Sequence, residues 1–156
     1  MMRKNSGFTT LELMVTIAIV AVIAAITMPP YLKWWRASRL QNAVSGFTAD
    51  IEMAKTEAIR ENAFVVIEFY PGSYKIFVDS NKDWGSSGEK ILLDRILPPS
   101  VSIDTASLEF PPPNEKFRFN SRGIPADILT PKTIKIIQAG NNRQITINRL
   151  GNINVQ

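Results

Sequence analysis

The chain has 156 residues, of which 45% are hydrophobic, and a formal net charge of +4 at pH 7, which fits one ordinary domain plus an N-terminal segment. It contains no cysteine and no histidine. Disulfides, thiol nucleophiles, cysteine zinc sites and lipoprotein attachment are therefore excluded, and the commonest general base is missing. Arg3 and Lys4 supply part of the mild positive charge at the start of the chain, and no polybasic footprint follows.

An uncharged apolar segment runs from Leu13 to Leu32. At about 1.5 Å per residue it is long enough to cross a bilayer core of about 30 Å. A secretory signal would end in an A-x-A-like site, and no two alanines lie two residues apart between Leu13 and Tyr31. A plain single-pass anchor is the second interpretation. Neither accounts for Glu12 at the head of the segment, because a carboxylate near a membrane is costly unless it has a partner.

A cut between Gly7 and Phe8 would supply that partner. The new α-amino group of Phe8 would lie four residues before Glu12, on the same helical face. The carboxylate of one subunit could then meet the terminal amine of the next. The residues lost, 1–7, carry the positive charges that hold the N-terminus on the cytoplasmic side.

The stretch KNSGFTTLELMVTIAIVAVIA resembles the class III leader of type IV prepilins and type II secretion pseudopilins. The resemblance implies that a prepilin peptidase cleaves after Gly7 and methylates the amine of Phe8. Glu12 becomes the fifth residue of the mature chain. The family usually has Leu and then Ile before this glutamate, and here the order is Thr10, Leu11. The resemblance also implies a kink at Pro29, here doubled by Pro30.

An amphipathic stretch follows, and its apolar positions advance by three or four residues. These positions are Leu40, Val44, Phe47, Ile51, Ala54 and Ala58. We therefore expect one helix from about Phe8 to Asn62, interrupted or bent at Pro29 and Pro30. Its part 8–32 would be the transmembrane or fibre-core helix, and its part 33–62 would pack on a head.

Trp34 and Trp35, with Lys33 and Arg36, lie where the apolar segment ends. Aromatic and cationic residues are favoured at a membrane boundary, and packing of the tryptophans against a head is an equally good account.

Residues 63–156 predict an all-β head. Runs rich in β-branched and aromatic residues alternate with breaks at Pro98-Pro99, 111–113, 123–125, Gly140-Asn141-Asn142 and Gly151. The strands are expected at 64–70, 74–79, 90–97, 101–103, 108–110, 116–120, 133–138, 144–149 and 153–155. The predicted fold class is α+β, with a long N-terminal helical spine packed on a C-terminal antiparallel sheet or sandwich.

Two stretches resemble the GspH/FimT family of minor pseudopilins and minor pilins: ADIEMAKTEAIRENAFVVIEF, where the spine ends and the first strand begins, and FRFNSRGIPADILTPKTIKIIQAGNNRQITINRLGNINVQ at the end of the head. Phe119, Gly123 and Gly151 take the positions of the family's closing pattern. The resemblance implies a structural subunit of a type II secretion pseudopilus or a type IV pilus, not an enzyme, without cofactor. It would be a single-pass protein of the bacterial inner membrane with its head in the periplasm. It would then enter a fibre with the head near the tip.

The implied partners are other pilin-type subunits, the prepilin peptidase and the inner-membrane assembly platform. DNA binding by a competence minor pilin is the alternative, with Lys135, Arg143 and Arg149 as candidate contacts. Related DNA-binding members carry a G-R-x-R-type motif near the C-terminus, where this chain has Gly151-Asn152-Ile153-Asn154. The missing arginines count against DNA, since phosphate contacts need Lys or Arg.

The segment 79–89 is a weak metal candidate. Asp79, Asn81 and Asp83 alternate like the first ligands of an EF-hand loop, but Trp84 and Lys90 stand where that loop needs Gly and Glu. An ordinary hairpin loop rich in Asp, Asn and Gly is the competing interpretation.

Overall fold

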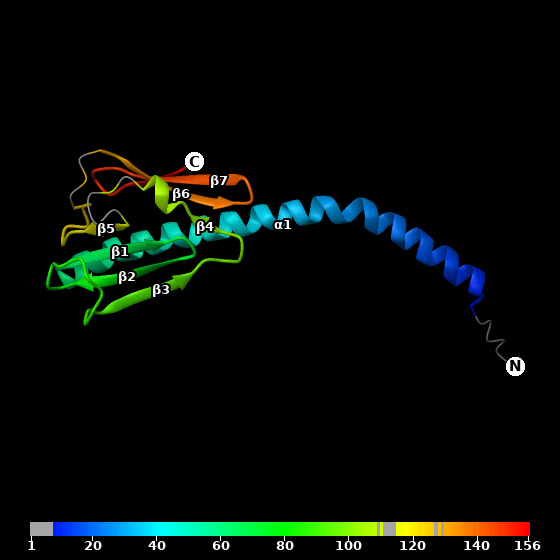
Figure 1. Ribbon diagram of the computed structural model, residues 1–156, viewed down its shortest axis with the longest axis horizontal. Helices are drawn as coiled ribbons and strands as arrows, with labels where there is room; N and C mark the ends of the chain where they lie inside the picture. The colour runs from blue at the N-terminus through cyan, green and yellow to red at the C-terminus, as the bar shows by residue number, and fades with distance from the viewer. Residues whose placement is uncertain (1–7, 109, 111–114, 127, 129) are drawn as a thin grey trace, which may run out of the picture. The chain divides into compact units, whose positions relative to one another are not determined.

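The computed structural model describes residues 8–108, 110, 115–126, 128 and 130–156, apart from the side chain of Pro29. It contains one helix followed by two antiparallel sheets (Figure 1). The chain divides after Ala37 into two compact units. The predicted α+β architecture is confirmed.

Helix α1 spans Thr10–Glu61, and local signals set both of its ends. The hydroxyl of Thr9 accepts a hydrogen bond from the backbone N–H of Glu12 at 3.2 Å, as an N-cap does. At the other end Asn62 has φ +49°, Asn62 N–H donates to Ile59 O, and Ala63 N–H donates to Ala58 O. This pair of bonds is a Schellman motif, in which asparagine tolerates the left-handed conformation.

The two prolines do not end the helix. The helical assignment runs through Pro29 and Pro30 without interruption, so the expected interruption is wrong and a bend at these residues stays a prediction. Each proline lacks an N–H, so neither carbonyl four residues earlier receives its helical hydrogen bond from them.

The first sheet has the strand order β3-β2-β1-β5 and the second the order β4-β6-β7-β8. The first contains β1 (Phe64–Tyr70), β2 (Ser73–Asp79), β3 (Ile91–Ile96) and β5 (Lys116–Phe119). The second contains β4 (Ser102–Ile103), β6 (Lys132–Gln138), β7 (Asn141–Ile147) and β8 (Ile153–Val155). A short 3-10 helix, η1 (Thr105–Ser107), follows β4.

Two strand predictions differ from the structure. Residue 109 of the expected strand 108–110 lies outside the described residues, and Leu108 and Phe110 are buried but lie in no strand. The Phe110 ring packs in the core, 5.6 Å from the Phe69 ring and 5.5 Å from the Phe117 ring. Their apolar character signals core contacts rather than a ladder. The expected break at 140–142 is also misplaced. Ala139 and Gly140 form the turn, with φ of 45° and 86°, as a two-residue type I′ hairpin requires.

One hydrophobic core joins the second half of α1 to both sheets. The helical stripe predicted from Leu40 to Ala58 is buried, and it packs with inward residues of β1, β2, β5, β6 and β7. Phe47 lies near the centre, with its ring 4.8 Å from Tyr74 and 6.1 Å from Phe69. The amphipathic part of the helix is therefore the central support of the head.

A buried polar contact fixes the helix against the first sheet. The carboxylate of Asp50 on α1 accepts a hydrogen bond from the Tyr74 hydroxyl at 2.5 Å. It also pairs with the Arg95 guanidinium at 2.7 and 3.1 Å. Burial, and next the hydrogen bond to Asp50, raise the pKa of Tyr74. The hydroxyl therefore stays protonated and keeps donating at any physiological pH.

Two glycines let the closing loops approach each other. Gly123 and Gly151 have φ of +70° and +78°. A Cβ on Gly151 would lie 3.0 Å from the backbone oxygen of Gly123 and 3.2 Å from Pro125. The ammonium of Lys55 on α1 donates to Gly151 O at 3.2 Å. Gly151 therefore needs both its backbone freedom and its missing side chain.

The contacts of Gly151 predict that Gly151→Ala lowers the free energy of unfolding by about 2–4 kcal/mol, through backbone strain and a clash with backbone atoms. Gly140→Ala is the matched control, because Gly140 has φ +86° but nothing within 4 Å of the added Cβ. It should cost only about 1 kcal/mol. Urea unfolding of the purified full chain in detergent measures both. Equal losses would contradict the close approach at Gly151.

Candidate assembly site

The first turn of α1 presents the residues that the processing motif singled out. Gly7 lies outside the described residues. The Phe8 side chain is 78% exposed, and Glu12, in the first turn, is exposed as well. None of the described residues forms an ion pair with the Glu12 carboxylate. The carboxylate is thus open to a cation from another molecule.

Glu12 also has a local position that the sequence analysis missed. With Thr9 as N-cap, Glu12 is the third helical residue, and the T-x-x-E spacing is that of a capping box. A carboxylate in the first turn also interacts favourably with the helix dipole. The spacing was readable from the sequence, so any test of Glu12 has to separate helix capping from contact with a partner.

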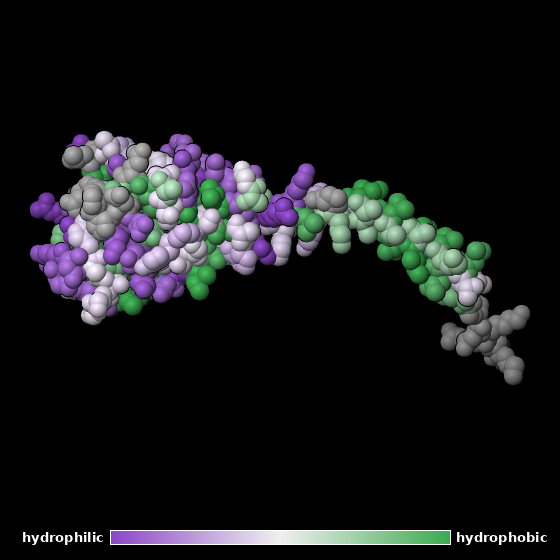
Figure 2. Space-filling model, viewed as in Figure 1, coloured by the Kyte–Doolittle hydropathy of each residue, from purple (hydrophilic) through white to green (hydrophobic). Residues whose placement is uncertain are grey.

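The apolar half of α1 contacts nothing in the described chain that would remove it from water. Its large apolar side chains from Leu11 to Met28 are 51–72% exposed. Figure 2 shows them as a hydrophobic surface, whereas the head is mostly hydrophilic. By length and composition this helix is long and apolar enough to cross a membrane. An exposed apolar surface of this extent marks a contact with membrane or protein.

The two threonine hydroxyls within this half are hydrogen-bonded to their own helix. The hydroxyl of Thr16 donates to Leu13 O at 2.8 Å, and that of Thr27 donates to Ile23 O at 2.9 Å. A hydroxyl bonded to its own helix costs less in an apolar environment than an unpaired one. Both threonines are therefore compatible with lipid or with a packed helix bundle.

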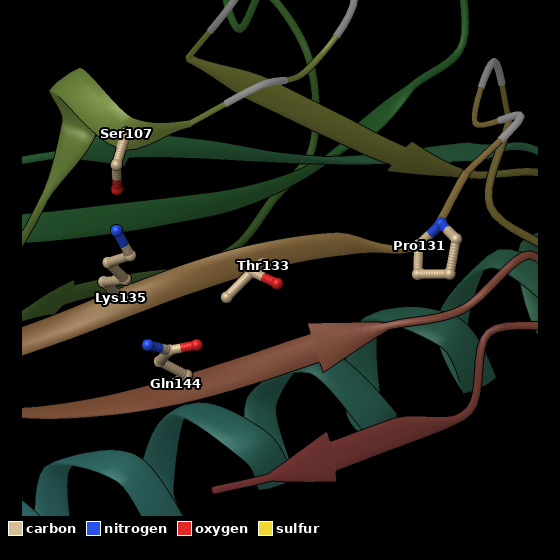
Figure 3. Close-up of a pocket in the computed structure, with 5 residues that line it drawn as sticks. All are labelled: Ser107, Pro131, Thr133, Lys135 and Gln144. Atoms are coloured by element: carbon tan, nitrogen blue, oxygen red, sulfur yellow. The ribbon is translucent and has the colours of Figure 1, made fainter.

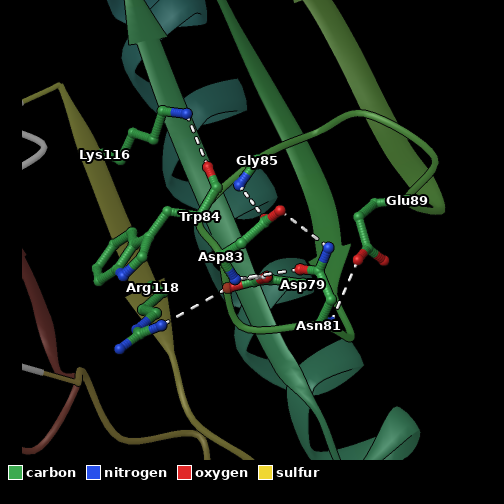
Figure 4. A network of polar contacts seen from close by, with 8 residues as sticks. All are labelled: Asp79, Asn81, Asp83, Trp84, Gly85, Glu89, Lys116 and Arg118. Carbon is green, nitrogen blue, oxygen red and sulfur yellow. Dashed lines mark hydrogen bonds and ion pairs between the residues drawn. The ribbon is translucent and has the colours of Figure 1, made fainter.

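The metal candidates of the loop 79–89 are engaged with protein donors (Figure 4). The buried carboxylate of Asp79 accepts from Asp83 N–H at 3.1 Å. The Asn81 amide donates to Asp83 Oδ2 at 3.0 Å, and Gly85 N–H donates to Asp83 Oδ1 at 2.6 Å. The alternating acids therefore build a folded loop through hydrogen bonds within it.

Arg118 places a cation beside this loop. Its guanidinium nitrogen lies 3.6 Å from Asp79 Oδ2. Its guanidinium carbon is 3.8 Å from the Trp84 ring centroid and 4.4 Å from that of Phe64. Lys116 also stabilises the loop. Its ammonium donates to Trp84 O at 2.7 Å and forms an ion pair with Glu68 at 2.9 Å. Sequence reasoning missed this cluster because its members are far apart along the chain, where Lys116 follows Trp84 by 32 residues.

The nucleic-acid candidates do not form one surface. Lys135 lines a polar pocket with Ser107, Pro131, Thr133 and Gln144 (Figure 3). Lys135 pairs with Gln144 in the β6–β7 register and Arg143 with the next residue, Ile136. Successive strand residues point to opposite faces of a sheet, so Lys135 and Arg143 belong to opposite faces. Arg149 follows β7 in a turn. DNA binding stays a prediction that these observations do not support.

Comparison with protein families gives two matches. The model of "Type II transport protein GspH" matches residues 43–151, and that of the "Prokaryotic N-terminal methylation motif" matches residues 2–28. The first spans the head and the helix packed on it. The second spans the apolar half of α1 and the residues before it.

Individual relatives agree with this family. Pilin-like protein PilA1 of Thermus thermophilus is 28% identical over 162 residues, which is 93% of this chain and 94% of PilA1. A fimbrial protein of Pseudomonas aeruginosa is 34% identical over 70 residues, 45% of each chain.

Two solved structures show the same fold. The type IV minor pilin FimU of Pseudomonas aeruginosa aligns with a TM-score of 0.60 at 17% identity, over 79% of this chain and 92% of FimU. The minor pseudopilin EpsH of Vibrio cholerae aligns with a TM-score of 0.55 at 15% identity, over 76% of this chain and 96% of EpsH.

The loop geometry predicts that millimolar calcium leaves the thermal unfolding temperature unchanged, because Arg118 already provides the positive charge next to Asp79. Differential scanning fluorimetry of the full chain in detergent measures this, with Asp79→Asn as the control for non-specific effects. A specific ligand at 100 times its dissociation constant stabilises a protein by about 2.7 kcal/mol. A rise of several degrees, absent in Asp79→Asn, would restore the metal interpretation.

Proposed function

This chain belongs to the GspH family of type II transport proteins, a family of structural subunits rather than enzymes, and from that premise we propose that it assembles into a pseudopilus or pilus through α1. The head would lie near the fibre tip and bind other minor subunits. The observation that carries the proposal is the apolar half of α1, whose exposed side chains have no covering partner within the described chain.

Processing comes first in this proposal. Residues 1–7 are a leader, the prepilin peptidase cuts between Gly7 and Phe8, and the new amine of Phe8 is methylated. The match of residues 2–28 to the methylation motif supports this step. The exposure of Phe8 ahead of the first helical turn supports it as well, since a peptidase needs access to the bond.

Residues 8–32 then lie in two environments in turn, first the membrane and then the fibre. In the inner membrane they are a single transmembrane helix, with the head in the periplasm. In the fibre the same side chains pack against helices of other subunits, after transfer by the assembly platform. Lipid tails and aliphatic side chains are similarly apolar, so the exchange has little net hydrophobic cost and packing decides the outcome.

Glu12 directs the register of that packing. Its carboxylate meets the methylated amine of Phe8 on a neighbouring subunit, forming a charge-assisted pair in an apolar interface. A charge left unpaired there is strongly disfavoured, so subunits out of register are rejected. The Glu12 carboxylate is exposed and forms no ion pair with any described residue, which supports this role.

The first test is the mass of the N-terminus. Protein extracted from the membranes of its own cells should begin with N-methylated Phe8, and mass spectrometry of the intact chain would show the loss of residues 1–7 plus one methyl group. Gly7→Leu should keep the leader, because the residue before the cut is changed. An unprocessed wild-type chain, or a cut elsewhere, would overturn the processing step.

The second test separates the two roles of Glu12. Glu12→Gln keeps a side chain that suits the third position of a capping box but removes the charge. It should insert normally and enter sheared fibres at least tenfold less, measured by immunoblot.

Thr9→Val is the matched control for Glu12→Gln. It removes the N-cap, at a cost of about 1 kcal/mol in helix stability, but leaves the Glu12 charge, so fibre incorporation should persist. If Glu12→Gln assembled as well as wild type while Thr9→Val failed, capping rather than pairing would be the role of Glu12.

A further inference from the structure

The residues from Tyr31 to Arg36, here called the belt, follow the apolar half of α1 directly. All six side chains are exposed. Trp34 is 65% exposed, Tyr31 60% and Trp35 45%. Both tryptophans are thus on the surface, as the boundary explanation of the sequence expects.

The belt separates aromatic and cationic side chains around the helix. At about 100° per residue, Tyr31, Trp34 and Trp35 fall within an arc of about 100°. The Tyr31 and Trp34 rings lie 6.2 Å apart. Lys33 and Arg36, three residues apart, share the opposite side. The belt therefore has one amphipathic aromatic face and one face with two positive charges.

The charge pattern of the chain suits an anionic partner on that cationic face. Between Glu12 and Asp50 every charged residue is a cation, namely Lys33, Arg36 and Arg39. These three outnumber Arg3 and Lys4 on the other side of the span. A long domain crosses the membrane largely regardless of charge, so cations are tolerated beside this end of the span. Anionic headgroups at that surface would attract them.

We propose that the belt binds anionic phospholipid headgroups at the membrane surface that faces the head. Trp34, Trp35 and Tyr31 set the depth of the helix, and Lys33 and Arg36 contact the phosphates. The inference rests on the membrane-anchored stage of the proposed function and goes beyond it, because it assigns a ligand class to this segment. The belt would hold the subunit at a fixed depth until it is extracted.

Two observations favour lipid over an acidic segment of another protein. The belt begins at Tyr31, within the last two residues of the uncharged segment Leu13–Leu32, at a separation from Glu12 that matches a bilayer core of about 30 Å. Its aromatic residues are the two types enriched at the level of the headgroups. An acidic protein surface would explain the cations but not the three exposed aromatic rings beside them.

The experiment uses the full chain with Trp84→Phe, so that Trp34 and Trp35 are its only tryptophans. It is reconstituted in phosphatidylcholine vesicles in which brominated phosphatidylcholine or brominated phosphatidylglycerol replaces part of the lipid. Quenching of tryptophan fluorescence by each lipid gives their relative binding at the belt. Phosphatidylglycerol should be preferred. Each cation removed should lower the preference up to about fivefold, and Lys33→Gln with Arg36→Gln should bring it close to one.

Arg143→Gln with Arg149→Gln is the matched control, because it removes the same charge from exposed positions in the head, and it should keep the preference. High salt should weaken the preference of the unsubstituted belt. Equal quenching by both lipids in an inserted chain, or weak quenching by either, would contradict lipid binding by the belt and leave the proposed function standing. A chain removed from vesicles by an alkaline wash would overturn the membrane anchor of the proposed function, and the belt with it.

Discussion

The structure depends on one constraint: every turn of α1 has apolar side chains that must leave water. From Leu40 to Ala58 the two sheets of the same chain cover them, and Phe47 at the centre contacts both Tyr74 and Phe69. From Leu11 to Met28 the described chain offers no cover, and those side chains stay more than half exposed. The apolar side chains of α1 are therefore covered in its second half and uncovered in its first half. An incomplete apolar surface is the physical basis of a subunit that must be embedded or assembled.

Two buried carboxylates help to hold the head together. Asp50 ties α1 to Tyr74 and Arg95, and Arg118 lies against the Trp84 ring beside the buried Asp79. A buried carboxylate without such partners would be costly. Both oxygens of Asp50 have partners, whereas Asp79 Oδ2 has Arg118 at 3.6 Å and no hydrogen bond among the described residues.

Glu12 combines a local and an intermolecular role without conflict. Capping needs a polar side chain at the third helical position, whereas pairing needs its negative charge and its exposure. Both are met by one residue because the first turn has N–H groups without helical partners and the Glu12 side chain is exposed. The belt at the other end of the apolar half carries the cations Lys33 and Arg36. Charged residues therefore lie on both sides of a segment that has none.

The sequence by itself determined the features that depend on neighbouring residues. These are the apolar segment, the amphipathic stripe from Leu40 to Ala58, the processing motif around Gly7 and Phe8, and most strand positions. Only the tertiary structure showed which charged residues of the head contact one another. It also showed why Gly151 must lack a side chain. It also decided that Leu108 and Phe110 pack in the core without joining a strand. The physical reason is distance along the chain: Asp50 meets Arg95, and Asp79 meets Arg118, only after folding, whereas periodicity and capping are fixed within a few residues.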